Sequence, residues 1–324
     1  MSTKATAIAH TMQGLLKYHG LKNHELRIPF HDSISVNLDA LYTKTTVEFG
    51  NYENDSLKIN DQKQKGNVLD RSLTIINKIR KMSGIQEKVK IISENNIKFG
   101  EVKGLGFSSS AGAALAGAAF KAAKLDSKYG WDLKIISRIA RLLAGSACRS
   151  VVGEYARWYA GTNDETSFAE KIATKDNLDL KIIAVPLSYD YSTESAHKEV
   201  LTSNFFNARL NSVNTRIEKI QESIIHGELS ELGKLVEEDS LELHALTMTG
   251  KDRILLIRPE TLNIINLVKQ KQKENKPVYY SMQTGPSIFI NTNNEHCNEI
   301  YSEIKELGLN PITSSIGNSV RISN

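Results

Sequence analysis

Residues 145–150 (Gly-Ser-Ala-Cys-Arg-Ser) are the stretch whose residue types most clearly allow binding chemistry, because they place one guanidinium among small side chains. The fork of donors on Arg149 matches the two oxygens of a carboxylate and stays charged at every working pH. Its small neighbours would let a ligand approach the backbone closely. An arginine at the edge of a helix is more often part of a surface ion pair, so this stretch alone leaves both interpretations open.

A second candidate site is the serine-rich run that follows two glycines at 104 and 106. Ser108, Ser109 and Ser110 precede a long run of alanine and glycine. Serine favours the start of a helix and alanine its interior. A helix start exposes backbone N–H groups and partial positive charge, and both favour phosphate. The run lacks the Gly-Lys-Ser/Thr ending of a Walker motif, and the alternative is a close-packed helix with a serine cap.

The composition is that of a globular enzyme. The chain has 324 residues, of which 40% are hydrophobic and 24% charged, and 41 basic against 37 acidic side chains leave a net charge of +4. This small excess, without a basic stripe studded with aromatic residues, does not favour nucleic acid as a partner. The first thirty residues lack the apolar core of a signal peptide, and no stretch of about 18 apolar residues is present. We therefore expect a cytoplasmic protein without a membrane partner.

The two cysteines, Cys148 and Cys297, are too few for a disulfide framework or a zinc cluster. Cys148 lies among small residues, so it is predicted to be a buried packing residue. No group of His, Cys, Asp and Glu has the spacing of a metal site. The sequence therefore predicts no protein-bound metal.

Strands and helices alternate irregularly, without the steady rhythm of a parallel sheet, which predicts an α+β fold. Period-two or short apolar runs predict strands over 33–38, 41–49, 89–93, 178–187, 278–282 and 287–290. Helical spacing predicts helices over 68–82, 203–226, 229–247, 260–274 and 294–307, after the serine run, and from residue 133. Residues 51–65 are expected to be turn-like. The apolar run from 178 divides the chain into an N-terminal lobe (1–177, with the serine-rich loop) and a C-terminal lobe (178–324).

Residues 104–112 resemble the phosphate loop of the GHMP kinase superfamily. Within it the chain is similar to the diphosphomevalonate decarboxylases at several segments, in the family's order along nearly the whole chain: 16–18, 34–36, 93–96, 145–150 and 239–244. The resemblance implies a two-lobed GHMP-kinase-like fold with the active site between the lobes. It also implies an enzyme that phosphorylates a tertiary 3-hydroxyl with ATP and then expels phosphate and carbon dioxide to form an alkene.

Carried over by position, the resemblance implies that Arg149 holds the substrate carboxylate and that Ser146 lies in the same pocket wall. Lys17 would neutralise charge near C3, and Ser109 would face the phosphate that is transferred or lost. The other implied substrate-binding residues are Tyr18, Ser108, Ser110, Thr284 and, for the 5-phosphate, Arg71.

The chain departs from the family at several positions. Gln283 replaces the Asp that is the family's presumed base or orienter for the 3-hydroxyl, and an amide accepts no proton. Residues 97–103 form a longer, more charged approach to the phosphate loop. Leu21 replaces a Lys thought to contact the diphosphate, and Arg157 replaces a small apolar residue. His19 replaces a Trp, and its role, structural or phosphate-contacting, stays open.

These departures are explained if the substrate arrives already phosphorylated at C3. The neutral Gln283 amide would donate to a phosphate oxygen, whereas an Asp about 4 Å away would repel it by about 4 kcal/mol at an effective dielectric near 20. This combination resembles the mevalonate 3,5-bisphosphate decarboxylases, a branch of the family that makes isopentenyl phosphate and needs no cofactor. The alternatives are an ATP-dependent diphosphomevalonate decarboxylase or mevalonate 3-kinase with Mg-ATP, an inactive chain, and a binding module. The partner would be a small phosphorylated C6 acid, and a homodimer is expected because the family often forms dimers.

Overall fold

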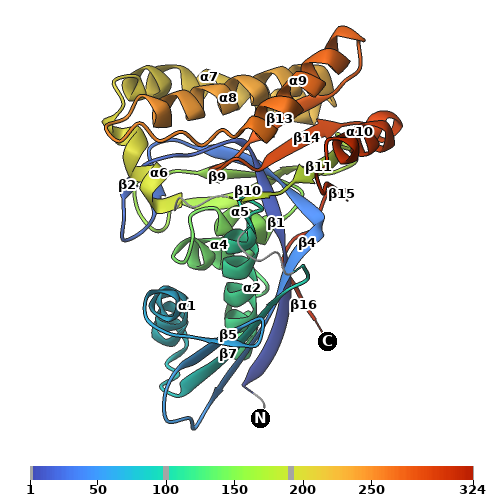
Figure 1. Cartoon of the computed structure of the whole chain (residues 1–324). Coiled ribbons are helices and arrows are strands. Elements are labelled where there is room, and N and C mark those ends of the chain that lie inside the picture. Colours follow the sequence, from blue (N-terminus) through green and yellow to red (C-terminus); the bar gives the residue numbers. More distant parts are fainter. Residues whose placement is uncertain (1–2, 98–101, 189–192, 324) are drawn as a thin grey trace.

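A long, mostly antiparallel sheet forms the first lobe of the chain (Figure 1). The computed structural model describes residues 3–97, 102–188 and 193–323. The central strands are β1 (Lys4–Leu16) and β4 (Ser33–Gly50), which pair along most of their length. The other strands extend the sheet along the edge of β4 opposite β1. β9 (Tyr155–Tyr159) and then β10 (Phe168–Ala173) lie beside the start of β4, and β7 (Lys88–Asn95), β5 (Ser56–Ile59) and β6 (Gln62–Gln64) lie beside its end. Of the described strands in this sheet, only β5 and β7 pair in parallel.

Helices pack on one face of this sheet. The central one, α2 (Phe107–Ala122), lies against β1 and β4 and contacts α1 (Asn67–Ser83), α4 (Leu133–Arg141) and α5 (Ala147–Val152). It is buried on almost every side because small side chains let its neighbours approach closely; a Cβ on Gly112 would lie 2.7 Å from the Cβ of Ala147. The short helix α3 (Asp126–Tyr129) follows α2.

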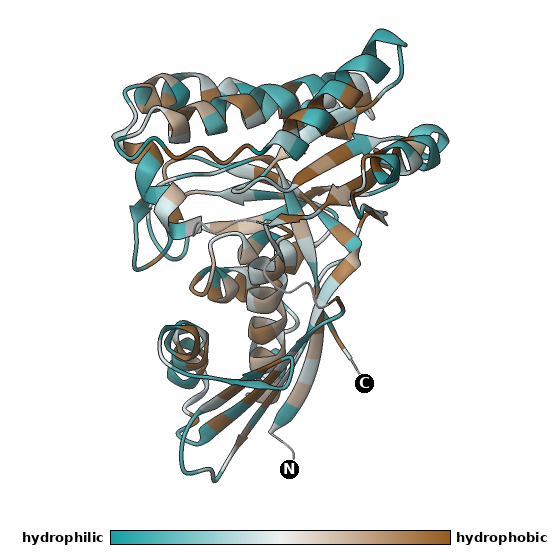
Figure 2. Cartoon of the chain, in the orientation of Figure 1, coloured by the Kyte–Doolittle hydropathy of each residue, from teal (hydrophilic) through white to brown (hydrophobic). Residues whose placement is uncertain are grey.

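The second lobe has its own antiparallel sheet, in the order β13 (Tyr279–Met282), β14 (Ile288–Thr292), β11 (Lys181–Val185) and β15 (Ile312–Ser314). Helices α8 (Leu229–Met248), α9 (Pro259–Lys273) and α10 (Asn294–Glu306) pack against it, and α7 (Phe206–Ile225) lies beside α8 and contacts β1, β4 and β10. Figure 2 shows α7 and α8 banded in hydrophilic and hydrophobic colours, as expected for helices with one face in solvent.

The two lobes share an apolar core. One cluster of buried residues joins side chains of β1 and β4, such as Leu15 and Val36, to Ile182 of β11 and to Val213 and Ile217 of α7. The last strand, β16 (Arg321–Ile322), returns to pair with β1. The lobes are therefore held together, and the end of β1 points toward the region where they meet.

Small elements border that region. The hairpin β2 (Leu21–Asn23) and β3 (Ile28–Pro29) follows β1, and β8 (Val102–Lys103) pairs with β12 (Leu187–Ser188). The helix α6 (Thr193–Glu199) and a 3-10 turn (Val200–Thr202) follow β12. Of the charged approach predicted at 97–103, residues 98–101 lie outside the described part of the chain.

Most predicted elements are present, and the fold is the α+β type that was predicted. The strands predicted at 33–38 and 41–49 are one continuous strand, β4, and the predicted turn at 51–65 contains the hairpin β5–β6. The sequence did not predict β1, because its second half is buried on both faces and shows no polar alternation. It also did not predict β9 and β10.

Candidate active site

One cavity of about 520 Å³ lies where the end of β1, the starts of α2 and α5, and the β13–β14 turn meet. Most of its walls come from the first lobe, and the second lobe adds this turn and residues of α6. All but one of the residues predicted for catalysis or substrate binding line it, namely Lys17, Tyr18, Arg71, Ser108, Ser109, Ser146, Arg149, Gln283 and Thr284. Segments that are far apart in the sequence therefore form one site.

The start of α2 forms one wall of the cavity. No side chain caps this helix, and Gly106 precedes it at φ +81°. A Cβ at Gly106 would lie 2.9 Å from the carbonyl oxygen of Met12, so only glycine fits there. The Ser109 hydroxyl donates to the Gly106 carbonyl at 2.5 Å and keeps its lone pairs. An uncapped helix start facing a cavity is suited to a phosphate group.

Arg149 is a buried cation that has no anionic partner among the described residues. Its side chain is 1% exposed, and its guanidinium carbon lies 5.5 Å from the Tyr18 ring centre and 6.0 Å from the Trp158 ring centre. Burial lowers its pKa, and no carboxylate of the described residues is among the charges that act on it. The surface ion pair that the sequence left open is therefore wrong. Because a buried, unpaired charge is costly, the site is prepared for an anion.

The small residues around Arg149 let aromatic rings pack against it. A Cβ at Gly145 would lie 2.5 Å from the Tyr18 hydroxyl and 2.8 Å from the Trp158 ring. Cys148 is buried, as predicted, and its thiol contacts the Gly145 carbonyl at 3.0 Å. Glycine at 145 therefore lets Tyr18 lie beside the guanidinium.

Lys17 follows β1 and is held by α8. Its Nζ donates to the Ser240 hydroxyl at 2.7 Å and lies 3.6 Å from the Asp239 carboxylate, while its backbone N–H donates to the same carboxylate at 2.9 Å. Arg209 contacts Asp239 at 2.9 Å and donates to the Lys17 carbonyl at 2.7 Å. Burial lowers the pKa of Lys17 to about 8, although Asp239 opposes the shift. The remaining ammonium donors can serve a ligand.

Gln283 is bound to the end of β1. Its amide oxygen accepts from the Gly14 N–H at 2.9 Å, and its amide nitrogen donates to the Gly14 carbonyl at 3.0 Å and to the Ser281 hydroxyl at 3.1 Å. His244 contacts the Gln283 carbonyl at 3.0 Å. Both amide hydrogens are used, so the predicted donation from Gln283 to a phosphate oxygen does not fit this arrangement. Its side chain joins the lobes instead.

The family models place these residues in a known context. Residues 9–169 match a diphosphomevalonate decarboxylase-like N-terminal domain, and residues 190–319 match a mevalonate 5-diphosphate decarboxylase C-terminal domain. The chain belongs to the diphosphomevalonate decarboxylase family. Its members are carboxy-lyases, and so is this chain.

Relatives and solved structures agree. The chain is 35% identical to a phosphomevalonate decarboxylase of Haloferax volcanii, and the match covers 98% of this chain and 97% of the relative. It is 24% identical to a mevalonate 3,5-bisphosphate decarboxylase of Thermoplasma acidophilum, and that match covers 88% of this chain and 69% of the relative. Among solved structures, mevalonate diphosphate decarboxylase from Staphylococcus aureus superposes with a TM-score of 0.93 at 28% identity, covering 100% and 99% of the two chains. The predicted GHMP-like fold is thereby confirmed.

Ser110 is the one predicted residue that does not line the cavity of this decarboxylase. Its side chain is fully buried; its hydroxyl lies 2.6 Å from the Thr43 hydroxyl and donates to the Phe107 carbonyl at 3.1 Å. The helical turn directs Ser110 toward the sheet, whereas Ser108 and Ser109 face the cavity. Ser110 was predicted to contact the substrate, but in the structure its hydroxyl instead bonds the start of α2 to β4.

Other departures from the family pattern lie at different distances from the cavity. Leu21 is buried in the β2–β3 hairpin and is not part of the lining. Arg157 pairs with Asp32 and Glu218 and connects β9 to α7. His19 does line the cavity, and its Nε2 lies 3.0 Å from the Thr284 hydroxyl.

Among the lining residues that were not predicted, those with ionisable side chains are Arg27, Glu194 and His197. They come from the β2–β3 hairpin and from α6, which are short elements in polar segments of the sequence. Nothing in their local pattern distinguishes them from solvent-exposed loop residues. Only the packing of the two lobes brings them to the site.

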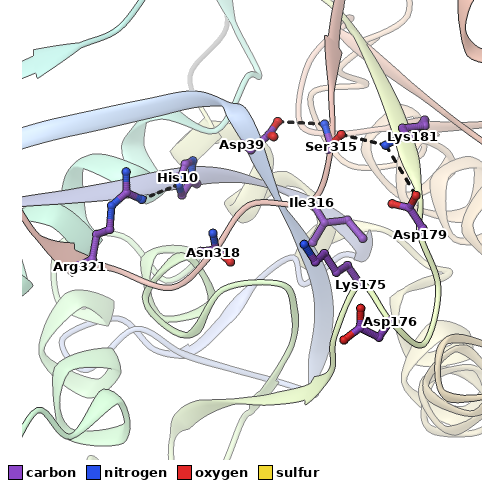
Figure 3. Close-up of a pocket in the computed structure, with 10 residues that line it drawn as sticks. All are labelled: His10, Asp39, Lys175, Asp176, Asp179, Lys181, Ser315, Ile316, Asn318 and Arg321. Carbon is purple, nitrogen blue, oxygen red and sulfur yellow. Dashed lines mark hydrogen bonds and ion pairs between the residues drawn. The ribbon is translucent and has the colours of Figure 1, made fainter. Parts of the chain in front are cut away.

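A larger hollow of about 740 Å³ lies beside β1, β11 and β16 (Figure 3). Several of its polar groups contact one another: Arg321 donates to His10, Asp39 accepts from the Ser315 N–H, and Lys181 lies between Ser315 and Asp179. None of the predicted site residues lines it. We therefore place the chemistry in the smaller cavity.

Within the described residues, no three His, Cys, Asp or Glu side chains are grouped to hold a metal ion. In the same part of the chain, no helix combines the length and the hydrophobicity needed to cross a bilayer.

Proposed function

We propose that this decarboxylase converts mevalonate 3,5-bisphosphate into isopentenyl phosphate, carbon dioxide and phosphate without ATP. The observation that carries the proposal is Gln283, which stands where the family pattern has an Asp and is hydrogen-bonded to both backbone groups of Gly14. A neutral amide held in this way can neither accept a proton from a 3-hydroxyl nor repel a phosphate already attached there.

The reaction needs two bond cleavages. The C3–O bond breaks with its electron pair leaving on phosphate, and positive charge develops on the tertiary carbon. The bond between the carboxylate carbon and C2 then breaks, its electrons form the C2–C3 double bond, and carbon dioxide leaves. No proton has to be removed from substrate, so the lack of a carboxylate base at position 283 is no obstacle.

The first lobe stabilises the leaving phosphate. The ammonium of Lys17 and the open start of α2 face the cavity. The Ser109 hydroxyl faces it too and can donate to phosphate once it turns away from the Gly106 carbonyl, to which it now donates. Fixed donors and a positive helix start are most favourable where negative charge grows, as it does on a departing phosphate. Burial keeps water away and increases the strength of these interactions.

Arg149 positions the carboxylate. Its buried guanidinium can bind both carboxylate oxygens and align the breaking C–C bond with the developing empty orbital. The carboxylate loses its charge as carbon dioxide forms, so binding that is too tight would favour the ground state. The Tyr18 and Trp158 rings beside the guanidinium supply a weaker, aromatic contact that remains when the anion is gone.

A second candidate is ATP-dependent decarboxylation of mevalonate 5-phosphate or 5-diphosphate. It is supported by the name and 35% identity of the Haloferax volcanii relative. It is also supported by the solved structure of a complex with MVAPP, AMPPCP and magnesium, which superposes with a TM-score of 0.91 at 28% identity. The glycine loop and α2 fit nucleotide phosphates as well as a substrate phosphate, and bound Mg-ATP would supply the phosphoryl group that makes the 3-hydroxyl a leaving group.

The test measures carbon dioxide release from three substrates: mevalonate 3,5-bisphosphate, 5-phosphate and 5-diphosphate, each with and without Mg-ATP. We expect release from the bisphosphate in the absence of ATP, with Arg149→Gln as the inactive control. Release only in the presence of ATP, with the 5-phosphate or 5-diphosphate as the better substrate, would establish the second candidate instead.

A further inference from the structure

One end of the active-site cavity carries three residues that the proposed reaction does not use. They are Arg27 from the β2–β3 hairpin and Glu194 and His197 from α6. Arg27 Nη1 lies 3.8 Å from Glu194 Oε2, a long ion pair in which the side chains are 17% and 43% exposed. A pair this loose leaves the guanidinium free to bind another anion.

The backbone at Arg27 is in an uncommon conformation. Arg27 has φ +50°, in the left-handed region that residues other than glycine seldom occupy. The turn before it is closed by the Asn23 side chain, which accepts from the Leu26 N–H at 2.9 Å. A hairpin that keeps a long cationic residue in such a conformation at a cavity wall indicates a role for that side chain.

Arg27 and Arg71 act on the same region of the cavity. Burial lowers the pKa of Arg71, the positive charge of Arg27 lowers it further, and the Glu194 carboxylate opposes that shift. Arg71 donates one hydrogen bond to the Leu143 carbonyl at 2.8 Å, which leaves most of its donors available. Two guanidiniums and one carboxylate thus share this end of the cavity.

His197 adds a neutral donor. Its Nδ1 accepts from the Gly20 N–H at 3.2 Å, so the neutral ring carries its proton on Nε2. Burial lowers its pKa to about 4, which keeps the ring uncharged near neutral pH. The His197 ring stacks on the Tyr18 ring with centres 5.0 Å apart, and its centre lies 4.6 Å from the centre of the His19 ring. Packing against these two rings fixes its orientation.

We infer that Arg27, Arg71 and His197 bind the C5 phosphate of the substrate, and that Glu194 makes this subsite selective for a phosphate monoester over a diphosphate. Two cations and a neutral donor match a dianion. A second phosphate would add negative charge beside the Glu194 carboxylate without adding a cation. Leu21, buried where the family pattern has a diphosphate-contacting Lys, offers no compensating charge. The inference rests on the proposed function in one respect, namely that the substrate carries a phosphate at C5.

Direct binding tests this subsite independently of the chemistry. Calorimetry without nucleotide would compare mevalonate 5-phosphate with mevalonate 5-diphosphate on the wild-type chain, Arg27→Gln and Glu194→Gln. Glu222→Gln is the matched control, because Glu222 is an exposed acid on α7 outside the cavity lining. We expect the wild type to favour the monophosphate by at least about tenfold and Glu194→Gln to reduce that preference by about tenfold. The Glu222→Gln control should have the same preference for the monophosphate as the wild type.

Arg27→Gln should weaken binding of the 5-phosphate by about 10- to 100-fold, the usual cost of a charge-assisted hydrogen bond. Arg27→Lys keeps the charge but loses the forked pair of donors. Its affinity for the 5-phosphate should therefore lie between those of Arg27→Gln and the wild type. An unchanged preference in Glu194→Gln, or unchanged 5-phosphate binding in a folded Arg27→Gln, would overturn the inference. Turnover that requires ATP would defeat the proposed reaction and leave this result intact.

Discussion

The two lobes contribute different kinds of groups to the active site. From the first lobe come the uncapped start of α2 and Arg149, a buried guanidinium that pairs with no carboxylate in the described part of the chain. From the second lobe comes Gln283, whose amide hydrogens are both bonded to protein groups. The first lobe thus provides unsatisfied charge for a ligand, and the β13–β14 turn of the second provides neutral, satisfied contacts that fix the first. The second lobe reaches the ligand elsewhere, through Glu194 and His197 of α6.

The largest effect is expected when a charge is added at Gln283, the neutral residue that the second lobe contributes. Gln283→Asp and Gln283→Asn are equally short, so both lose the paired bonds to Gly14, but only Asp introduces an anion. We expect Asp to lower kcat/KM on the bisphosphate by up to about a thousandfold, from about 4 kcal/mol of repulsion, and Asn to lower it by about tenfold. Steady-state kinetics on folded variants measures both. Equal losses would show that the shape of Gln283, and not its neutrality, is what matters.

A second test weakens the charged side without removing its charge. Arg149→Lys keeps a cation but loses the bidentate fork, so kcat should fall about a hundredfold, or about 3 kcal/mol. Circular dichroism would verify folding of this buried variant. A folded Arg149→Lys enzyme with the wild-type rate would exclude Arg149 from the carboxylate site.

The pH profile examines Lys17, which lies where the lobes meet. Its pKa of about 8 means that the ammonium is present below pH 8 and loses its proton above it. If the cation stabilises the leaving phosphate, kcat/KM should fall as pH rises through about 8, by up to about tenfold per pH unit. In Lys17→Arg the charge persists, so whatever activity remains should not show this fall. A flat wild-type profile to pH 10 would contradict the role.

The smallest effects are expected for two neighbouring serines, Ser109 and Ser110, whose alanine variants should differ in kcat and in stability. Ser109→Ala removes a hydroxyl at the cavity and should lower kcat about tenfold with little change in stability. Ser110→Ala removes a buried hydroxyl bonded to Thr43 and Phe107, so it should cost about 1 kcal/mol of unfolding free energy with nearly unchanged kcat. Denaturant unfolding and kinetics on both variants check this, and the reverse pattern would return Ser110 to the site.

Local sequence runs were sufficient for much of the fold and for the first-lobe site. Helices such as α1 and α8 show apolar residues at helical spacing, and the glycine- and serine-rich run at 104–110 can form little other than a loop leading into a helix. The stretch around Arg149 is likewise informative by itself, because small residues next to a cation are a local pattern. The strand β1 was missed because burial on both faces removes the alternation that identifies a strand.

Whether a side chain is unsatisfied or bonded was decided only by the tertiary structure. The sequence determined that Gln283 is neutral, but not that residues 14 and 283, from different lobes, exchange two hydrogen bonds. It contained Arg27, Glu194 and His197 without any sign that they share a cavity. Hydrogen bonding, burial and charge proximity depend on distances between segments that are remote along the chain. Residue types determine which chemistry is available to this protein, and packing of the two lobes decides which groups are left free to perform it.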